Sequence, residues 1–230
     1  MEIRGRAYRI CASVTGKDEQ AIARAALAAE ELGVDLVELR LDSVEGLDRE
    51  KVRSVFRMTA GLGVPRIATV MPSSIFGRFS GRPKERAELL LEAASHADYV
   101  DLGAEILGEV DWLLERVSRR SKVILSWHAN RMLTVQEMKE FARSRQGCSV
   151  YKIAMPARSV ADNLVALEGC LALEGVKRVV FCYGRDGVPS RVLSPLFGAE
   201  WAYAALRKGE ETAPGQVDVE TLKRIREAFA

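Results

Sequence analysis

The chain has 230 residues, with 34 Lys and Arg side chains against 32 Asp and Glu, so its formal net charge at pH 7 is only +2. A charge this close to balance provides no field strong enough to attract nucleic acid or an anionic membrane surface. The chain has four cysteines without a CxxC pair and only two histidines, which argues against a structural zinc cluster. No apolar run is long enough to span a membrane, so we expect a cytoplasmic protein.

Short strand-like runs alternate with longer helix-like segments along the chain. The strand-like runs cover residues 7–14, 35–42, 65–71, 99–105, 122–128, 149–155, 178–184 and 201–206. The helix-like segments lie near 18–33, 48–62, 82–96, 109–120, 134–146, 158–174 and 218–229, with a weaker helical pattern over 188–199. This alternation predicts an α/β fold, a (β/α)8 TIM barrel that forms a single domain over residues 1–230. An open doubly wound sheet is the alternative, but no GxGxxG turn follows the first run.

Several helix ends carry specific signals. Thr134 followed by Glu137 three residues later is typical of a capping box. Gly33, Gly147 and Gly175 stand where the preceding helices should end.

The run DLVELRLD, residues 35–42, alternates apolar and charged side chains. In a closed barrel the apolar face meets the helices, so Glu38, Arg40 and Asp42 point inward, toward the carboxyl ends of the strands where barrel sites lie. Buried charges must pair with one another or with a polar ligand. The charged face therefore predicts a pocket rather than an exposed sheet edge.

Lys152 lies in the middle of the apolar run SVYKIAM. A lysine often extends its ammonium into water, which is the alternative interpretation. Its neighbours Tyr151 and Ile153 argue against an exposed strand. Burial lowers the pKa of a lysine amine, so part of it is neutral and able to attack a carbonyl. Lys152 is therefore a candidate for Schiff-base formation.

His128 ends the run that precedes the Lys152 run. Consecutive parallel strands are neighbours, so we expect His128 and Lys152 to reach one bound molecule, with His128 moving a proton on the carbon next to an imine. His96 precedes the fourth run and falls at the amino end of its strand, where we expect a structural role.

Two later segments provide polar groups. In GVPSRVLS, Ser190 and Arg191 follow the seventh run, and the Arg191 guanidinium could bind a carboxylate through two hydrogen bonds. The Pro-Gly turn of residues 212–218 is either an ordinary connection or a loop that closes over a substrate through Gln216.

Six short motifs occur in one order along nearly the whole chain: VELRLD (37–42), LSWH (125–128), YKIA (151–154), SRV (190–192), FGAEWAY (197–203) and APGQ (213–216). In these motifs the sequence resembles type I 3-dehydroquinate dehydratase of the shikimate pathway. The resemblance implies a (β/α)8 barrel, commonly a homodimer, that needs no metal or organic cofactor. The implied small-molecule substrate is 3-dehydroquinate, which loses water by syn elimination through an imine to give 3-dehydroshikimate.

The resemblance also implies a role for each matching residue. Lys152 forms the imine, and His128 is the general acid and base. Glu38 and Arg40 bind ring hydroxyls and Arg191 the carboxylate. The residues that complete the pocket are Ser13, Thr212 and Gln216.

One segment departs from the family pattern. Met71 and Ile75 stand where the family usually has an arginine and then a glutamate that helps to orient the histidine. Arg78 or Arg66 would replace the lost charge, unless the 71–81 loop is built differently. Asp101 or Glu105 on the fourth run would orient His128.

Two other functions share part of this pattern. A Schiff-base aldolase acting on a sugar acid or sugar phosphate would also use Lys152, but it should have phosphate-binding loops near the last two strands. A non-catalytic barrel that binds a quinate-like ligand would fit the loss of charge at Met71 and Ile75, and would form no covalent adduct.

Overall fold

The computed structural model describes residues 8–145 and 147–229. The predicted strand 7–14 starts, and the predicted helix 134–146 ends, at a residue outside this described part. The chain divides into two compact units: a middle unit, residues 12–125, and a terminal unit, residues 1–11 together with 126–230. A single domain over the whole chain therefore stays a prediction.

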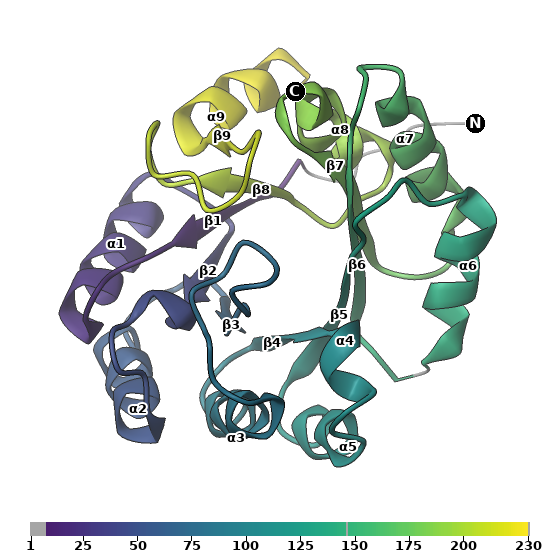
Figure 1. The fold of residues 1–230 in the computed structure, drawn as a ribbon. Coiled ribbons are helices and arrows are strands. Elements are labelled where there is room, and N and C mark those ends of the chain that lie inside the picture. Colours follow the sequence, from purple (N-terminus) through teal and green to yellow (C-terminus); the bar gives the residue numbers. More distant parts are fainter. Residues whose placement is uncertain (1–7, 146, 230) are drawn as a thin grey trace. The chain divides into compact units, whose positions relative to one another are not determined.

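The middle unit contains the first half of the βα alternation (Figure 1). Its strands are β1 (Ile10–Val14, from residue 12), β2 (Leu36–Arg40), β3 (Arg66–Thr69), β4 (Tyr99–Gly103) and β5 (Lys122–His128, to residue 125). Its helices are α1 (Glu19–Glu31), α2 (Arg49–Met58), α3 (Pro83–Ala93), α4 (Ala104–Leu107) and α5 (Trp112–Ser118), with a 3-10 turn, η1, at Leu41–Ser43. The neighbours β2, β3 and β4 run parallel to one another.

The terminal unit contains the second half. Its strands are β6 (Val150–Pro156), β7 (Arg178–Tyr183), β8 (Ala202–Ala205) and β9 (Val217–Asp218). Its helices are α6 (Val135–Ser144), α7 (Asp162–Ala172), α8 (Val188–Leu193) and α9 (Val219–Ala228), with 3-10 turns η2 (Arg185–Gly187) and η3 (Ser194–Phe197). Strand β6 is parallel to β7, with Lys152 opposite Val179, and β8 is parallel to β9.

All eight predicted strand-like runs contain a strand, and each predicted helical segment contains a helix. Every residue of β1, β2 and β4 is buried, as expected for parallel strands that are covered on both faces. Within the described residues, no helix is long and apolar enough to cross a membrane.

The ends of some strands differ from the predicted runs, and the weaker helical pattern contains a short helix. Strand β2 ends at Arg40 rather than at residue 42, because the Ser43 hydroxyl donates to the Arg40 carbonyl (2.6 Å) and closes the η1 turn. Strand β4 gives way at Gly103 to the short helix α4. The weak helical pattern near 188–199 contains α8, with a proline in its first turn, which is a favoured position for proline.

The predicted helix ends are confirmed. The Thr134 hydroxyl accepts from the Glu137 amide (3.2 Å), and the Glu137 carboxylate accepts from the Thr134 amide (2.8 Å), which is a capping box. Gly33, Gly147 and Gly175 have φ of 73°, 89° and 94°, in the left-handed region that ends helices.

Candidate functional site

Lys152 and His128 extend from the same face of their strands. The rings of Trp127 on β5 and Tyr151 on β6 both pack against Phe141 of α6, at centroid distances of 5.3 and 6.3 Å. Successive side chains of a strand alternate between its two faces. His128 and Lys152, each next in sequence to one of these rings, therefore lie on the face away from α6.

The carboxyl end of β5 lies beside β6, as predicted. The Ala129 amide donates to the Ala154 carbonyl (2.8 Å), and the Ala129 carbonyl accepts from the Tyr183 hydroxyl (2.9 Å). Lys152 is only 4% exposed, while His128 is partly open to solvent. The lysine amine is thus enclosed by protein rather than extended into water.

Two cations of the terminal unit, Lys152 and Arg191, each lie over an aromatic ring. The Lys152 Nζ atom is 4.6 Å from the centroid of the Tyr203 ring, and the Arg191 Cζ atom is 4.5 Å from that of Phe181. Both distances are within the range of a cation–π contact. Sequence reasoning did not single out Phe181, although it shares a strand face with Tyr183, at the carboxyl end of β7.

Arg191 is a buried guanidinium without an acidic partner among the described residues. It is 4% exposed, its Nη2 donates to the Pro214 carbonyl (3.2 Å), and its buried Nε has no hydrogen-bond partner in the described part of the chain. Burial lowers the pKa of Arg191 to about 10. A desolvated cation with an unused donor is suited to bind an anion, and a carboxylate matches its geometry.

The segment that presents Arg191 is fixed by buried hydrogen bonds. The Ser190 hydroxyl accepts from the Cys182 amide (2.8 Å), and the Ser190 amide donates to the side-chain carbonyl of Asn163 (2.9 Å). These bonds attach the first turn of α8 to β7 and α7, so Ser190 has a structural role in positioning Arg191.

Thr212 and Gln216 lie together in the turn before β9. The Thr212 amide and hydroxyl both donate to Gln216 Oε1, at 2.8 and 3.0 Å. Between them, the Pro214 carbonyl accepts from the Gly184 amide (3.0 Å) as well as from Arg191. Gly215 has φ of 76°, and a Cβ there would lie 2.1 Å from the Gly184 carbonyl oxygen, so only glycine fits. The turn is thereby attached to the segment that carries Arg191.

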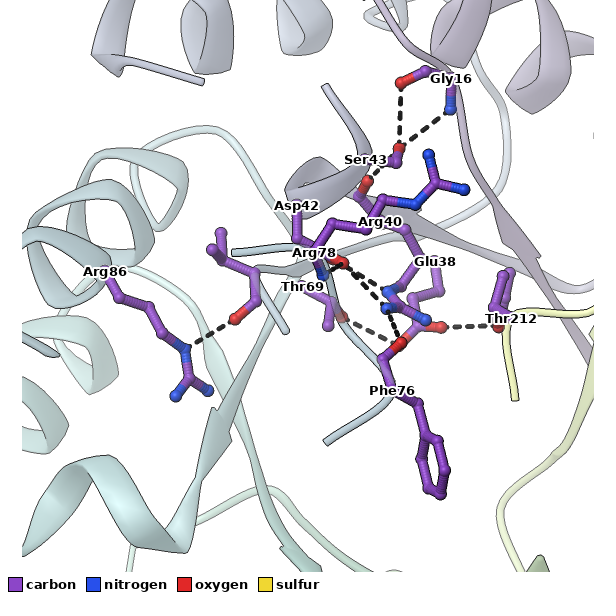
Figure 2. Close-up of polar contacts among 12 residues, drawn as sticks. Gly16, Glu38, Arg40, Asp42, Ser43, Thr69, Phe76, Arg78, Arg86 and Thr212 are labelled. Atoms are coloured by element: carbon purple, nitrogen blue, oxygen red, sulfur yellow. Dashed lines mark hydrogen bonds and ion pairs between the residues drawn. The ribbon is translucent and has the colours of Figure 1, made fainter. Parts of the chain in front are cut away.

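In the middle unit, Glu38 is held between two hydroxyl groups. The Ser13 hydroxyl donates to Glu38 Oε2 (2.6 Å) and the Thr69 hydroxyl to Oε1 (2.9 Å), from the neighbouring strands β1 and β3. Figure 2 shows Glu38 and Thr69 beside the Arg40 side chain. Thr69 was not predicted, although it is a polar residue within an otherwise apolar run, at the end of β3.

Arg40 and Asp42 pair with each other, as predicted for charges on this face. Arg40 Nε and Nη2 donate to the two oxygens of Asp42, at 3.0 and 2.9 Å (Figure 2). Burial opposes the charge of Arg40, but the carboxylates of Asp42, Glu38 and Asp101 together outweigh this effect, and the pKa of Arg40 is raised above its usual value.

This pair also holds the 71–81 loop. Arg40 Nη2 donates to the Phe76 carbonyl (3.2 Å), and Asp42 Oδ2 accepts from the Arg78 amide (3.1 Å), as Figure 2 shows. Phe76 has φ of 55°, the one positive value at a non-glycine residue in the described part of the chain. The loop is therefore built around the Arg40–Asp42 pair.

Arg66 or Arg78 was expected to replace the charge that the family's arginine provides at the position of Met71. Arg66 begins β3, and its guanidinium donates to the Phe56 carbonyl (3.1 Å) and the His96 carbonyl (3.0 Å), so it lies at the amino end of the strand. Met71 itself is buried. Arg78 binds Asp42 through its backbone, and its side chain is exposed.

Sequence reasoning missed Arg86, a buried guanidinium on α3. Its Nε donates to the Val70 carbonyl at the end of β3 (2.7 Å), and its Nη1 donates to Glu105 (2.7 Å). Arg86 precedes Leu90 and Ala93 on the buried stripe of the helix, and this spacing could have revealed it. Asp101 is buried on β4, and whether Asp101 or Glu105 orients His128 stays a prediction.

His96 has the structural setting that was expected. Its ring stacks on Phe56, with centroids 6.0 Å apart, and its Nε2 lies 3.6 Å from a Glu92 carboxylate oxygen. His96 lies shortly before the amino end of β4, as predicted.

The two units carry different chemistry. The terminal unit offers an enclosed amine that is suited to attack a carbonyl and an imidazole that is suited to transfer a proton. Its third group is a guanidinium without an acidic partner among the described residues, which is suited to bind a carboxylate. The middle unit offers the buried acidic groups Glu38, Asp42 and Asp101 and the buried cation Arg40, which suit hydroxyl groups.

Comparison with known proteins gives a consistent result. The family model described as type I 3-dehydroquinase matches residues 10–229. The chain is 31% identical over 222 residues to the 3-dehydroquinate dehydratase of Methanothermobacter thermautotrophicus, covering 94% of this chain and 95% of that protein. It is 32% identical over 223 residues to the enzyme of Methanopyrus kandleri, covering 95% and 98%.

Solved structures have the same fold. The type I 3-dehydroquinate dehydratase of Clostridium difficile, solved with covalently modified comenic acid, aligns with a TM-score of 0.86 at 21% identity, covering 98% of this chain and 93% of that one. The enzyme of Aquifex aeolicus aligns with a TM-score of 0.80 at 25% identity, covering 96% and 98%. The predicted α/β, (β/α)8 barrel class is confirmed. The chain belongs to the type I 3-dehydroquinase family.

Proposed function

We infer that the protein is a 3-dehydroquinate dehydratase, a hydro-lyase that converts 3-dehydroquinate to 3-dehydroshikimate in the shikimate pathway through a Schiff base. Membership of the type I family supports this activity. The single observation that carries the mechanism is the enclosed Lys152 amine on the same strand face as His128.

The chemistry follows from these two groups. The Lys152 amine adds to the substrate ketone and water leaves, which forms a protonated imine. His128 removes a proton from the neighbouring carbon, giving a neutral enamine. The enamine electrons then expel the hydroxyl from the next carbon, and His128 returns the proton to it on the same face, so that water is lost by syn elimination. Hydrolysis of the imine releases the product and Lys152.

The remaining residues bind the substrate. Arg191 takes the carboxylate, because its buried charge and unused Nε donor need an anion. Glu38 and Arg40 bind ring hydroxyls, with Ser13 orienting Glu38. Thr212 and Gln216 complete the pocket from a turn whose Pro214 carbonyl already bonds to Arg191.

We also propose that the enzyme acts as a cytoplasmic homodimer on this small molecule and needs no metal or organic cofactor. These proposals rest on the resemblance to the family.

The deciding experiment is a trapping assay with a matched lysine control. The unmodified protein is incubated with 3-dehydroquinate and borohydride, and the modified peptide is located by mass spectrometry. We expect the adduct on Lys152, and we expect Lys152→Ala to lose both the adduct and turnover. Lys177→Ala, at an exposed lysine just before β7, should keep both.

A His128→Gln variant separates the two steps. It should still form the adduct, while kcat falls by about 10²- to 10⁴-fold, which is the usual contribution of a general acid and base. An adduct on another lysine in Lys152→Ala would disprove the assignment. Carbon–carbon cleavage without the ultraviolet absorbance of the enone product would indicate the aldolase, and ligand binding without an adduct would indicate the non-catalytic barrel.

A further inference from the structure

The ring of Tyr203 lies under the Lys152 amine in a defined aromatic cluster of the terminal unit. The Tyr203 centroid is 4.6 Å from Lys152 Nζ and 6.4 Å from the Phe181 centroid, and Phe181 in turn lies under Arg191. Lys152 and Arg191 thus each have an aromatic face beneath the charged group.

The Tyr203 ring is held in place by its surroundings. Trp201, which is fully buried, packs edge-on against it, with centroids 6.1 Å apart and planes at 75°. Strand β8 has the sequence AYAA, so Tyr203 is its one large side chain. The ring is therefore a fixed surface that the Lys152 ammonium group contacts.

An aromatic face attracts a cation through its electron density, and this attraction is strongest where water is excluded. Lys152 is buried, so the contact belongs to the stronger class. The ring attracts the nitrogen when it is charged and much less when it is neutral. It therefore distinguishes the ammonium and the protonated imine from the free amine and the enamine.

We propose that Tyr203 is a positioning residue for Lys152, whose ring face holds the nitrogen and stabilises its cationic forms during the reaction. The functional part of this inference rests on the proposed Schiff-base chemistry. Other titratable or charged groups on the described strand faces and helix around Lys152 in this unit are His128 on β5, Tyr183 on β7 and Arg191 on α8. None of them changes in the variants below.

The test varies the electron density of the ring at nearly constant shape. Position 203 is replaced by Phe, by Leu, and by phenylalanines with one, two and three fluorine atoms. Trace labelling with acetic anhydride across a pH range, read by mass spectrometry at Lys152, gives the pKa of its amine without any substrate. The pH dependence of adduct formation with 3-dehydroquinate and borohydride is then measured on the same variants.

We expect Tyr203→Phe to match the unmodified protein in both measurements. Successive fluorination should lower the pKa of Lys152 progressively. Tyr203→Leu, which removes the ring, should give the largest decrease, about 0.5 to 1.5 pH units. The pH at which adduct formation begins should move by the same amount. The same fluorinated series at Phe141, whose partners are the rings of Trp127 and Tyr151, should shift neither measurement.

The two measurements separate the possible failures. A pKa of Lys152 that stays constant along the fluorine series would overturn the inference, because the ring would then act through its shape alone. A pKa that shifts in a protein forming no adduct would support the ring contact and overturn the proposed function instead.

Discussion

Arg191 carries a charge that no acidic side chain of the described residues balances. Its burial lowers its pKa to about 10, so holding it in place opposes folding. A residue that weakens the fold and leaves a donor unused is best explained by a ligand that supplies the missing charge. Replacing Arg191 should therefore weaken substrate binding without making the fold less stable.

Replacing Arg191 with Ala tests this relation. We expect kcat/KM to fall by on the order of 10²- to 10³-fold, because a charged hydrogen-bonded contact of about 3–4 kcal/mol is lost. The melting temperature should stay the same or rise, since an uncompensated buried charge is removed. Thermal unfolding and steady-state kinetics measure the two effects.

Arg178 provides the matched control for Arg191. It is also a buried arginine of the terminal unit, but its Nε donates to the Cys170 carbonyl (2.6 Å) and its Nη1 to the Val176 carbonyl (3.2 Å). Arg178→Ala should lower the melting temperature without a selective loss of substrate binding. A large loss of stability in Arg191→Ala would contradict the binding role.

Sequence reasoning placed some site residues and missed others for identifiable reasons. The face of Glu38 and Arg40 follows from strand alternation, which is local in sequence, and their burial confirms that the charged face is not an exposed edge. Arg86 meets Glu105, and Phe181 meets Arg191, through contacts between separate elements, and no short pattern encodes those contacts. The catalytic and binding roles themselves stay predictions.

At the scale of elements, the capping box of α6 makes a prediction about pH. The Arg131 guanidinium, together with the Thr134 amide and hydroxyl, lowers the pKa of Glu137 from 4.5 to about 2. A carboxyl group with a lowered pKa stabilises the fold above its unfolded pKa, and this contribution is lost as the pH falls through the folded value.

Glu137→Gln should therefore destabilise the protein at pH 7. The difference from the unmodified protein should shrink between about pH 4.5 and about pH 2. Urea unfolding at several pH values measures this difference. Glu140→Gln, on the same helix and bonded to Gln136, is the control and should show no such convergence.

The 71–81 loop makes a second prediction at this scale. A Cβ at Gly77 would lie 2.0 Å from the Met71 carbonyl oxygen, whereas one at Gly61 has nothing within 4 Å. We expect Gly77→Ala to lower stability by about 1–3 kcal/mol, through overpacking, and to raise KM, because the adjoining residues bond to Arg40 and Asp42. Gly61→Ala should change neither value by much. Equal effects of both variants would show that the loop is not tightly built.

The elements themselves were predictable because their signals are local. Short strand-like runs between longer helical patterns identified the strands, and the glycines with positive φ marked helix ends. Strand ends were less predictable, because the stop at Arg40 depends on the Ser43 hydroxyl, which closes a turn instead of extending the strand. The two-residue β9 is too short for any periodic pattern.

At the scale of the whole molecule, the resemblance predicts a homodimer. Light scattering coupled to size-exclusion chromatography should give a mass of twice 25.4 kDa at micromolar concentration. A mass of one chain over the whole concentration range would contradict this prediction.

The terminal unit joins residues that lie far apart in the sequence, and this has a consequence for biosynthesis. The Tyr8 hydroxyl donates to the Val192 carbonyl (2.7 Å), and the Arg9 carbonyl accepts from the Ala202 amide (2.9 Å). At a ribosomal rate of about 5–20 residues per second, Tyr8 waits roughly 10 to 40 s for Val192 to be made. The contiguous residues of the middle unit, 12–125, have all been made much earlier. During translation, Tyr8 and Arg9 must therefore stay available until residues 192 and 202 have been made.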